Sequence, residues 1–116
     1  MRISSLTATE YQTMALRTLN PDLSNMEQLE DGIMGLCGEA GECLDILKKY
    51  KFQGHELDKD HLVKELGDVS WYLAVTANAL GVGLDDVFKT NIKKLLERYP
   101  DGFITDKSVN RREGDI

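Results

Sequence analysis

Two pairs of acidic residues are the part of the sequence best suited to chemistry. The stretch "EAGE" contains Glu39 and Glu42, and the stretch "ELGD" contains Glu65 and Asp68. Both pairs have i, i+3 spacing, which makes the two side chains neighbours on the surface of a helix. Because like charges at this spacing repel each other, each pair is unfavourable unless a positive charge lies between its members. The spacing therefore points to a cation site.

The acidic pairs fall within two of the four helices that the sequence predicts. Hydrophobic periodicity and end signals place these helices at residues 7–19, 25–51, 59–80 and 84–99. Thr7 and Ser24 each precede a glutamate by three residues, which is the capping-box pattern, and Asp58 is a candidate cap for the third helix. With no strand-like alternation, the sequence predicts an all-α fold, a helical bundle of about four helices in one domain over residues 1–116, with a polar tail from about residue 104. A domain of 116 residues buries little surface by itself, so we expect oligomerisation to complete the bundle.

The second and third helices each have an apolar stripe at helical spacing. In the second helix the stripe contains Leu29, Ile33, Leu36, Cys37, Ala40, Leu44 and Leu47. In the third helix it contains Leu62, Leu66, Val69, Leu73, Ala77 and Leu80. Because the loop between the helices is short, we expect them to pack stripe to stripe as an antiparallel hairpin. The third helix is also apolar on its other sides, which favours Trp71 as a contact to a second subunit.

This packing would bring the two acidic pairs together. At about 100° per residue, Glu39 and Glu42 lie roughly 100° and 160° to one side of their stripe. Glu65 and Asp68 lie roughly 80° and 140° from theirs, in the same rotational sense. In an antiparallel pair, flanks of the same sense lie on the same side, and the heights of the pairs differ by less than one turn. The sequence therefore predicts that four carboxylates converge.

Converging carboxylates favour a hard divalent cation, Mg²⁺ with Mn²⁺ as a possible substitute. A di-iron bundle site would need a Glu-x-x-His pairing, and neither His55 nor His61 lies three residues after a glutamate. Cys37, Cys43 and these histidines lack the paired spacing of a structural zinc site. Gly38 and Gly41 would leave the backbone bare beside the carboxylates, so that a bulky ligand or another helix can approach.

The fourth helix offers groups that suit phosphate oxygens. Asn91, Lys94 and Arg98 follow one another on one side of it, as an amide, an ammonium and a guanidinium. The alternative is that Asn91 makes an ordinary buried hydrogen bond while Lys94 and Arg98 extend into solvent.

Composition excludes some classes of partner and favours one compartment. The net charge of −6 argues against general binding to nucleic acid or to a membrane surface, both of which need a basic face. Cys37 and Cys43 are separated by six residues on one predicted helix, so a disulfide between them is not expected, and two free thiols suit the cytoplasm. The N-terminus has no apolar signal-peptide core.

These motifs carry a resemblance to a known family. "GEAGE" followed by "KELGDV" resembles the E-x-x-E…E-x-x-D pattern of the MazG-like nucleoside triphosphate pyrophosphohydrolases, in the all-α NTP pyrophosphatase superfamily. "NIKKLLERYPDGF" is similar to the Asn-x-x-Lys-Leu-x-x-Arg-Tyr-Pro segment of that family. The resemblance spans about residues 11–103. It implies Mg²⁺-dependent hydrolysis of a nucleoside triphosphate between the α and β phosphates, and assembly as a homodimer or homotetramer. The chain has one copy of the domain, whereas some members have two or a fused partner.

The resemblance assigns Glu39, Glu42, Glu65 and Asp68 to metal and Asn91 and Lys94 to substrate. The catalytic candidates are Glu42, which would take a proton from the attacking water, together with Glu39 and Lys94. Further candidate substrate contacts are Arg98, Tyr72 and Gln12. Two alternatives stay open at this point, a non-catalytic helical module that binds a nucleotide or metal and a helical interaction module whose acidic side meets a basic protein.

Overall fold

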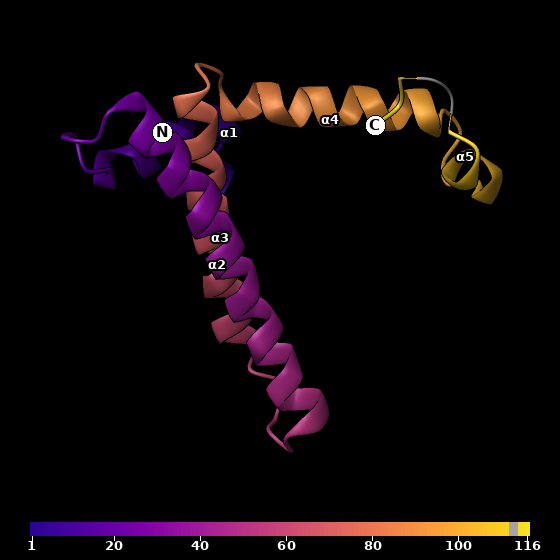
Figure 1. The fold of residues 1–116 in the computed structure, drawn as a ribbon, viewed down its shortest axis with the longest axis horizontal. Helices are drawn as coiled ribbons and strands as arrows, with labels where there is room; N and C mark the ends of the chain where they lie inside the picture. The colour runs from indigo at the N-terminus through magenta and orange to yellow at the C-terminus, as the bar shows by residue number, and fades with distance from the viewer. Residues whose placement is uncertain (112–113) are drawn as a thin grey trace. The chain divides into compact units, whose positions relative to one another are not determined.

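The computed structural model describes residues 1–111 and 114–116, and it confirms the all-α fold class. Apart from one isolated bridge between Pro100 and Gly102, the regular structure of these residues is helical. The elements are η1 Ile3–Ser5, α1 Ala8–Ala15, η2 Leu16–Thr18, α2 Asn25–Phe52, α3 Lys59–Ala79, α4 Leu84–Arg98 and α5 Thr105–Val109 (Figure 1). Among the described helices, none combines the length and the apolarity that crossing a membrane requires.

The predicted capping boxes form at the starts of α1 and α2. The backbone N–H of Glu10 donates to Oγ1 of Thr7 at 3.1 Å, and the N–H of Thr7 donates to the Glu10 carboxylate at 3.0 Å. Ser24 and Glu27 make the same reciprocal pair at 3.1 and 2.9 Å. Each box satisfies two donors that a helix start would otherwise leave unpaired. The short helix α5, in the tail, is an element that the sequence did not predict.

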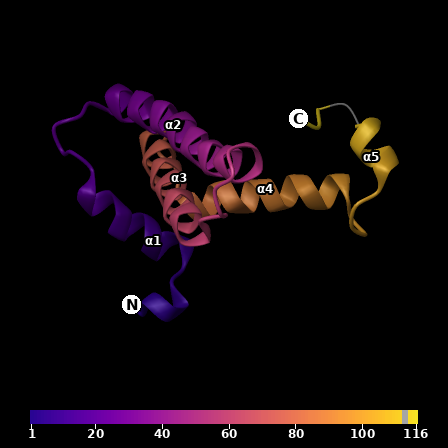
Figure 2. The same ribbon diagram turned by 90° about the horizontal axis from the view of Figure 1, so that it is seen from below.

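The chain divides into two compact units, Met1–Leu84 and Asp85–Ile116, which are described separately. In the first unit α2 and α3 form an antiparallel pair, side by side in both ribbon views (Figures 1 and 2). They are joined by a short loop in which Gly54 adopts a φ of 73°, a conformation that favours glycine. The side-chain amide of Asn25, at the start of α2, donates to the carbonyl of Ala79, at the end of α3, at 2.9 Å.

The two helices pack through faces other than the predicted apolar stripes. Gly32 of α2 lies against Thr76 of α3, and Gly35 lies against the ring of Tyr72. A Cβ atom at either glycine would overlap these side chains. The contacting face of α2 is therefore rotated by about one residue, roughly 100°, from the predicted stripe. Packing glycine against the neighbouring helix brings the two backbones closer than a leucine seam allows.

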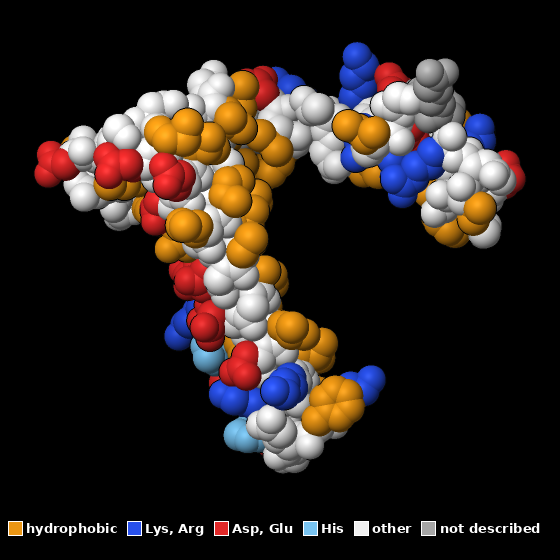
Figure 3. Space-filling view, viewed as in Figure 1, with side chains coloured by type: hydrophobic (Ala, Val, Ile, Leu, Met, Phe, Trp, Pro, Cys, Tyr) orange, Lys and Arg blue, Asp and Glu red, His pale blue; other side chains and the backbone are white. Residues whose placement is uncertain are grey.

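The predicted stripes are consequently only partly covered in the single chain, since Ala77 is buried and Leu73 packs against the core while other members face solvent. The exposed large side chains among them are Ile33 46%, Leu44 66%, Leu47 48%, Leu66 52% and Leu80 61%. Figure 3 shows apolar side chains spread over the surface of the first unit. The expectation of stripe-to-stripe packing between α2 and α3 was wrong, because apolar periodicity identifies an apolar side of a helix without identifying what covers it.

The helix α1 closes the buried core of the first unit. This core contains Ala15, Ala74 and Leu84, with the larger side chains of Tyr11, Trp71 and Leu73 packed against it. The buried side chain of Gln12 donates from Nε2 to the carbonyl of Ala74 at 3.1 Å, and its Oε1 accepts from the N–H of Leu84 at 2.8 Å. Gln12 thereby links α1 to α3 and to the first residue of α4.

Trp71 also packs onto α1. Its Nε1 donates to the carbonyl of Ala15 at 3.1 Å and to Oγ1 of Thr18 at 2.8 Å. Its ring makes an edge-to-face contact with Tyr72, with ring centroids 5.0 Å apart. The polar group of the indole is therefore satisfied within the chain. The contact of Trp71 with a second subunit stays a prediction.

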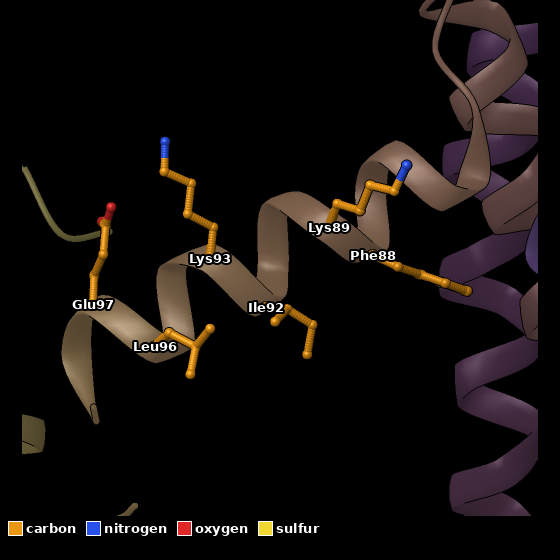
Figure 4. A pocket seen from close by; sticks show the side chains of 6 residues that line it. All are labelled: Phe88, Lys89, Ile92, Lys93, Leu96 and Glu97. Carbon is orange, nitrogen blue, oxygen red and sulfur yellow. The ribbon is translucent and has the colours of Figure 1, made fainter. Parts of the chain in front are cut away.

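In the second unit, α4 has an apolar side with exposed side chains. Phe88, Ile92 and Leu96 recur every four residues, and they are 47%, 55% and 59% exposed. They line a pocket with Lys89, Lys93 and Glu97, and in Figure 4 Lys93 and Glu97 point away from Ile92 and Leu96.

We expect Gly35→Ala to lower the free energy of unfolding by about 1–3 kcal/mol, because the added methyl group must displace the Tyr72 ring. Gly38→Ala is the matched control, because a Cβ atom there meets nothing within 4 Å. That variant should gain up to about 1 kcal/mol through helix propensity. Urea unfolding followed by circular dichroism measures both. Equal responses of the two variants would contradict the packing described here.

Candidate metal centre

Three carboxylates from α2 and α3 meet between the helices. One oxygen each from Glu39, Glu65 and Asp68 lies within 4.8 Å of the other two. The register explains the meeting, because α2 advances one turn from Gly35 to Glu39 while antiparallel α3 goes back one turn from Tyr72 to Asp68. The structure thus brings together three of the four acidic residues that the sequence singled out.

Glu42 lies outside this set of three oxygens. It is exposed, one turn beyond Glu39 on α2, and close enough for its charge to act on the Glu39 carboxyl. Glu42 instead lines a pocket near the loop end of the hairpin, together with residues that include Ile46, His55 and His61. Its side chain would have to turn toward Glu39 to serve as a fourth ligand.

The carboxylates of the cluster raise the pKa of one of its members, Glu39. The pKa of Glu39 is raised from 4.5 to about 7. The largest cause is a hydrogen bond with the carboxyl group of Glu65, followed by partial burial and by the negative charges of Glu65, Asp68 and Glu42. The cluster thus raises the pKa of one of its own members, and a cation bound near neutral pH would compete with protonation of Glu39.

Glu65 has a second partner that the sequence reasoning missed. Nε2 of His61 lies 3.1 Å from Oε1 of Glu65, one turn along α3. The predicted cap Asp58 accepts a hydrogen bond from the backbone N–H of His61 at 3.1 Å, which fixes this residue in the first turn of the helix. The sequence motifs concern His61 only as a possible metal ligand. The i, i+4 spacing of His61 and Glu65 was the available signal.

Two tyrosines border the cluster. The pKa of Tyr72 is raised, first by burial and then by the negative charges of Asp31, Glu39 and Asp68. The pKa of Tyr11 is raised by burial and by Asp68. The sequence reasoning named Tyr72 but not Tyr11, because nothing local in α1 indicates that it lies near α3.

The donor set fits a hard divalent cation. All three donors are carboxylate oxygens, the ligand type that Mg²⁺ and Mn²⁺ prefer. Two oxygens bound to one Mg²⁺ lie at most about 4.2 Å apart, so small side-chain rotations bring the three oxygens into range. Glu39 and Glu65 are half-buried and Asp68 is exposed, which leaves one side of the cluster open to solvent.

The other predicted substrate contacts differ in their exposure and in the hydrogen bonds that they already make. Both polar groups of the Gln12 amide are engaged, so a contact with substrate requires the loss of one hydrogen bond. In the second unit, Asn91 is exposed and Lys94 is half-buried. Arg98 is buried and pairs with Asp115 through Nε at 2.8 Å and Nη2 at 2.6 Å.

The Arg98–Asp115 pair joins α4 to the C-terminal tail. Arg98 holds the pKa of Asp115 below its usual range, and the positive charges of Arg111 and Lys94 lower it further. This pair uses Nε and Nη2, so a phosphate would have to meet the remaining N–H donors of Arg98 or displace Asp115.

Comparison with known proteins decides the family. The model of the MazG nucleotide pyrophosphohydrolase domain matches residues 28–103, a span that includes the whole carboxylate cluster. The chain belongs to the MazG family. The resemblance seen in the motifs is thereby confirmed, and the domain indicates a nucleotide pyrophosphohydrolase.

Two relatives illustrate how far the similarity to known proteins extends. The Gene 37 protein of Mycobacterium phage L5 is 39% identical over 94 residues, which cover 78% of this chain and 82% of that protein. The uncharacterized protein YvdC of Bacillus subtilis (strain 168) is 33% identical over 73 residues, which cover 55% of this chain and 69% of that protein. No solved structure matches the chain significantly.

We expect Glu39 to give the metal-free protein a stability that falls as the pH rises from about 4.5 to about 7. In this window the folded state holds a proton that the unfolded state has lost, so the free energy of unfolding decreases with pH. Glu39→Gln removes this group, and its stability relative to the parent should increase across the same window. Urea unfolding in the presence of EDTA measures the difference, and a difference independent of pH would contradict the shared proton.

Proposed function

We propose that the chain is a Mg²⁺-dependent nucleoside triphosphate pyrophosphohydrolase that cleaves between the α and β phosphates and releases a nucleoside monophosphate and pyrophosphate. Membership of the MazG family supports the reaction class. The observation that carries the proposal is the meeting of Glu39, Glu65 and Asp68 across two helices. The family match spans both compact units, which supports a single domain over residues 1–116.

Glu39, Glu65 and Asp68 would hold the cation, with Glu42 as a fourth ligand if its side chain turns inward. Mg²⁺, or Mn²⁺ in its place, supplies charge neutralisation for the triphosphate and increases the acidity of water. The like charges of the cluster then become favourable, because their mutual repulsion is replaced by attraction to one ion.

Glu42 is the candidate general base. It is exposed and lies outside the three-oxygen set, so its carboxylate is available to accept the proton of the attacking water. Glu39 would contribute to catalysis as a ligand of the cation.

The phosphates would be held by residues of α4. The Lys94 ammonium and the Asn91 amide are suited to phosphate oxygens, and Arg98 could join them by exchanging the Asp115 carboxylate for a phosphate. Candidate contacts to the nucleoside are Tyr72 and Gln12. A net charge of −6 favours a small anion bound through a metal over nucleic acid or a membrane surface, and the two cysteines favour the cytoplasm.

Pyrophosphate release from a panel of nucleoside triphosphates with Mg²⁺ tests the proposal. Glu39→Gln, Glu42→Gln, Glu65→Gln and Asp68→Asn should each lower kcat by about a hundredfold or more, because each removes a charged oxygen donor or the base. Far-ultraviolet circular dichroism should show that the helices persist.

The control is Glu30→Gln, which removes an exposed acid of α2 outside the cluster and should retain activity. If all four site variants kept full turnover, the site would be discarded. Nucleotide binding without turnover in the parent protein would favour the non-catalytic module instead.

We also propose that the protein is a homodimer or homotetramer. The exposed stripes of α2 and α3 and the apolar side of α4 leave more large apolar side chains in water than a stable monomer normally does. Sedimentation equilibrium should give a mass of two or four chains, and Leu44→Glu, in the middle of the α2 stripe, should shift it toward the monomer. A parent protein that sediments as one chain at micromolar concentration would refute this assembly.

A further inference from the structure

Among the described residues, His61 is the one imidazole that hydrogen-bonds to the carboxylate cluster. Its Nε2 lies 3.1 Å from Oε1 of Glu65. The His61 side chain is 53% exposed, while that of Glu65 is 16% exposed. His61 therefore lies at the edge of the site, where it contacts one member of the cluster from the solvent side.

We propose that His61 is a positioning residue, which holds Glu65 in the orientation that binds the divalent cation. This inference rests on the proposed function, because it assumes that Glu65 is a metal ligand. Carboxylates that bind metals are themselves hydrogen-bonded by neighbouring groups, and these partners contribute to metal affinity.

The direction of the hydrogen bond follows from the charge of the ligand. A Glu65 side chain that binds a cation is ionised, and an ionised carboxylate only accepts hydrogen bonds. Nε2 of His61 must therefore carry the proton and donate it to Oε1. This leaves the second oxygen of Glu65 to face the cation.

The need for such a donor comes from repulsion within the cluster. When all three carboxylates are ionised, as at alkaline pH, Glu39 and Asp68 repel Glu65, whose long side chain has several rotamers that lead away from them into solvent. A hydrogen bond from His61 opposes this movement. The side chain of Asp58 accepts a hydrogen bond from the backbone N–H of His61 and so holds this backbone in the first turn of α3. The His61 ring is therefore attached to a well-fixed position of the helix.

Binding of Mn²⁺ alone, followed by the electron paramagnetic resonance of the free ion at one fixed alkaline pH, tests the proposal. His61→Phe keeps the ring and removes the donor, and it should weaken Mn²⁺ binding about tenfold. His61→Gln keeps an N–H at a similar reach and should restore most of the affinity. His55→Phe, at the other exposed histidine, is the matched control and should bind like the parent.

Kinetics separate positioning from general damage to the fold. In His61→Phe the Mg²⁺ concentration for half-maximal activity should rise about tenfold, while kcat at saturating Mg²⁺ stays at the parental value. A structural defect would instead lower kcat at every Mg²⁺ concentration, and that result would overturn the proposal.

The Glu65→Gln variant distinguishes a failure of the metal centre from a failure of the positioning role of His61. If it loses Mn²⁺ binding while His61→Phe binds like the parent, the positioning role of His61 is wrong and the metal centre stands. If Glu65→Gln itself binds Mn²⁺ like the parent, the metal centre fails and the role of His61 fails with it.

Discussion

The close approach of α2 and α3 at two glycines is the constraint on which the site depends. Gly32 and Gly35 have no room for a Cβ atom, so the helices meet backbone to side chain at Thr76 and Tyr72. One turn further along, the same register forces carboxylates of the two helices together. Their repulsion opposes the packing that the glycines permit, and the shared proton on Glu39 relieves it when no cation is present. The helix packing and the repulsion between the carboxylates therefore oppose each other at the cluster.

Local features of the fold could be predicted because their causes are local. The capping boxes of Thr7 and Ser24 form between residues three apart, so the starts of α1 and α2 follow from the sequence alone. The choice of packing face could not be predicted in this way, since a neighbouring helix or subunit decides it. Glu39 and Glu65 nevertheless meet as predicted. The contacting residues Gly32 and Gly35 of α2, like Tyr72 and Thr76 of α3, each precede a stripe residue by one position, so both contacting faces are rotated in the same sense and Glu39 still meets Glu65 and Asp68.

Contacts between distant parts of the chain were the least predictable. Arg98 and Asp115 are 17 residues apart in the sequence, so no helical period relates them, and sequence reasoning placed the Arg98 side chain either on a phosphate or in solvent. Gln12 was expected to touch substrate, yet its amide is buried against two backbone groups of the first unit. Tyr11 lies near Asp68 because α1 packs against α3, a contact between distant residues that no local pattern indicates. Family motifs identify the charged groups of a site well, but they do not indicate which polar side chains are buried and hydrogen-bonded within the fold.

The buried amide of Gln12 bears on where the folding unit begins. The family match starts at residue 28, after α1 has ended. A chain trimmed to that match would lack the two hydrogen bonds of Gln12 and would uncover Ala74 and Leu84, which α1 helps to bury. Each lost hydrogen bond removes about 0.5–1.5 kcal/mol, and the newly exposed apolar surface adds to this loss, which is large for a small domain. Conserved-domain limits are thus a poor guide to truncation in this protein, whose leading helix is structural scaffold.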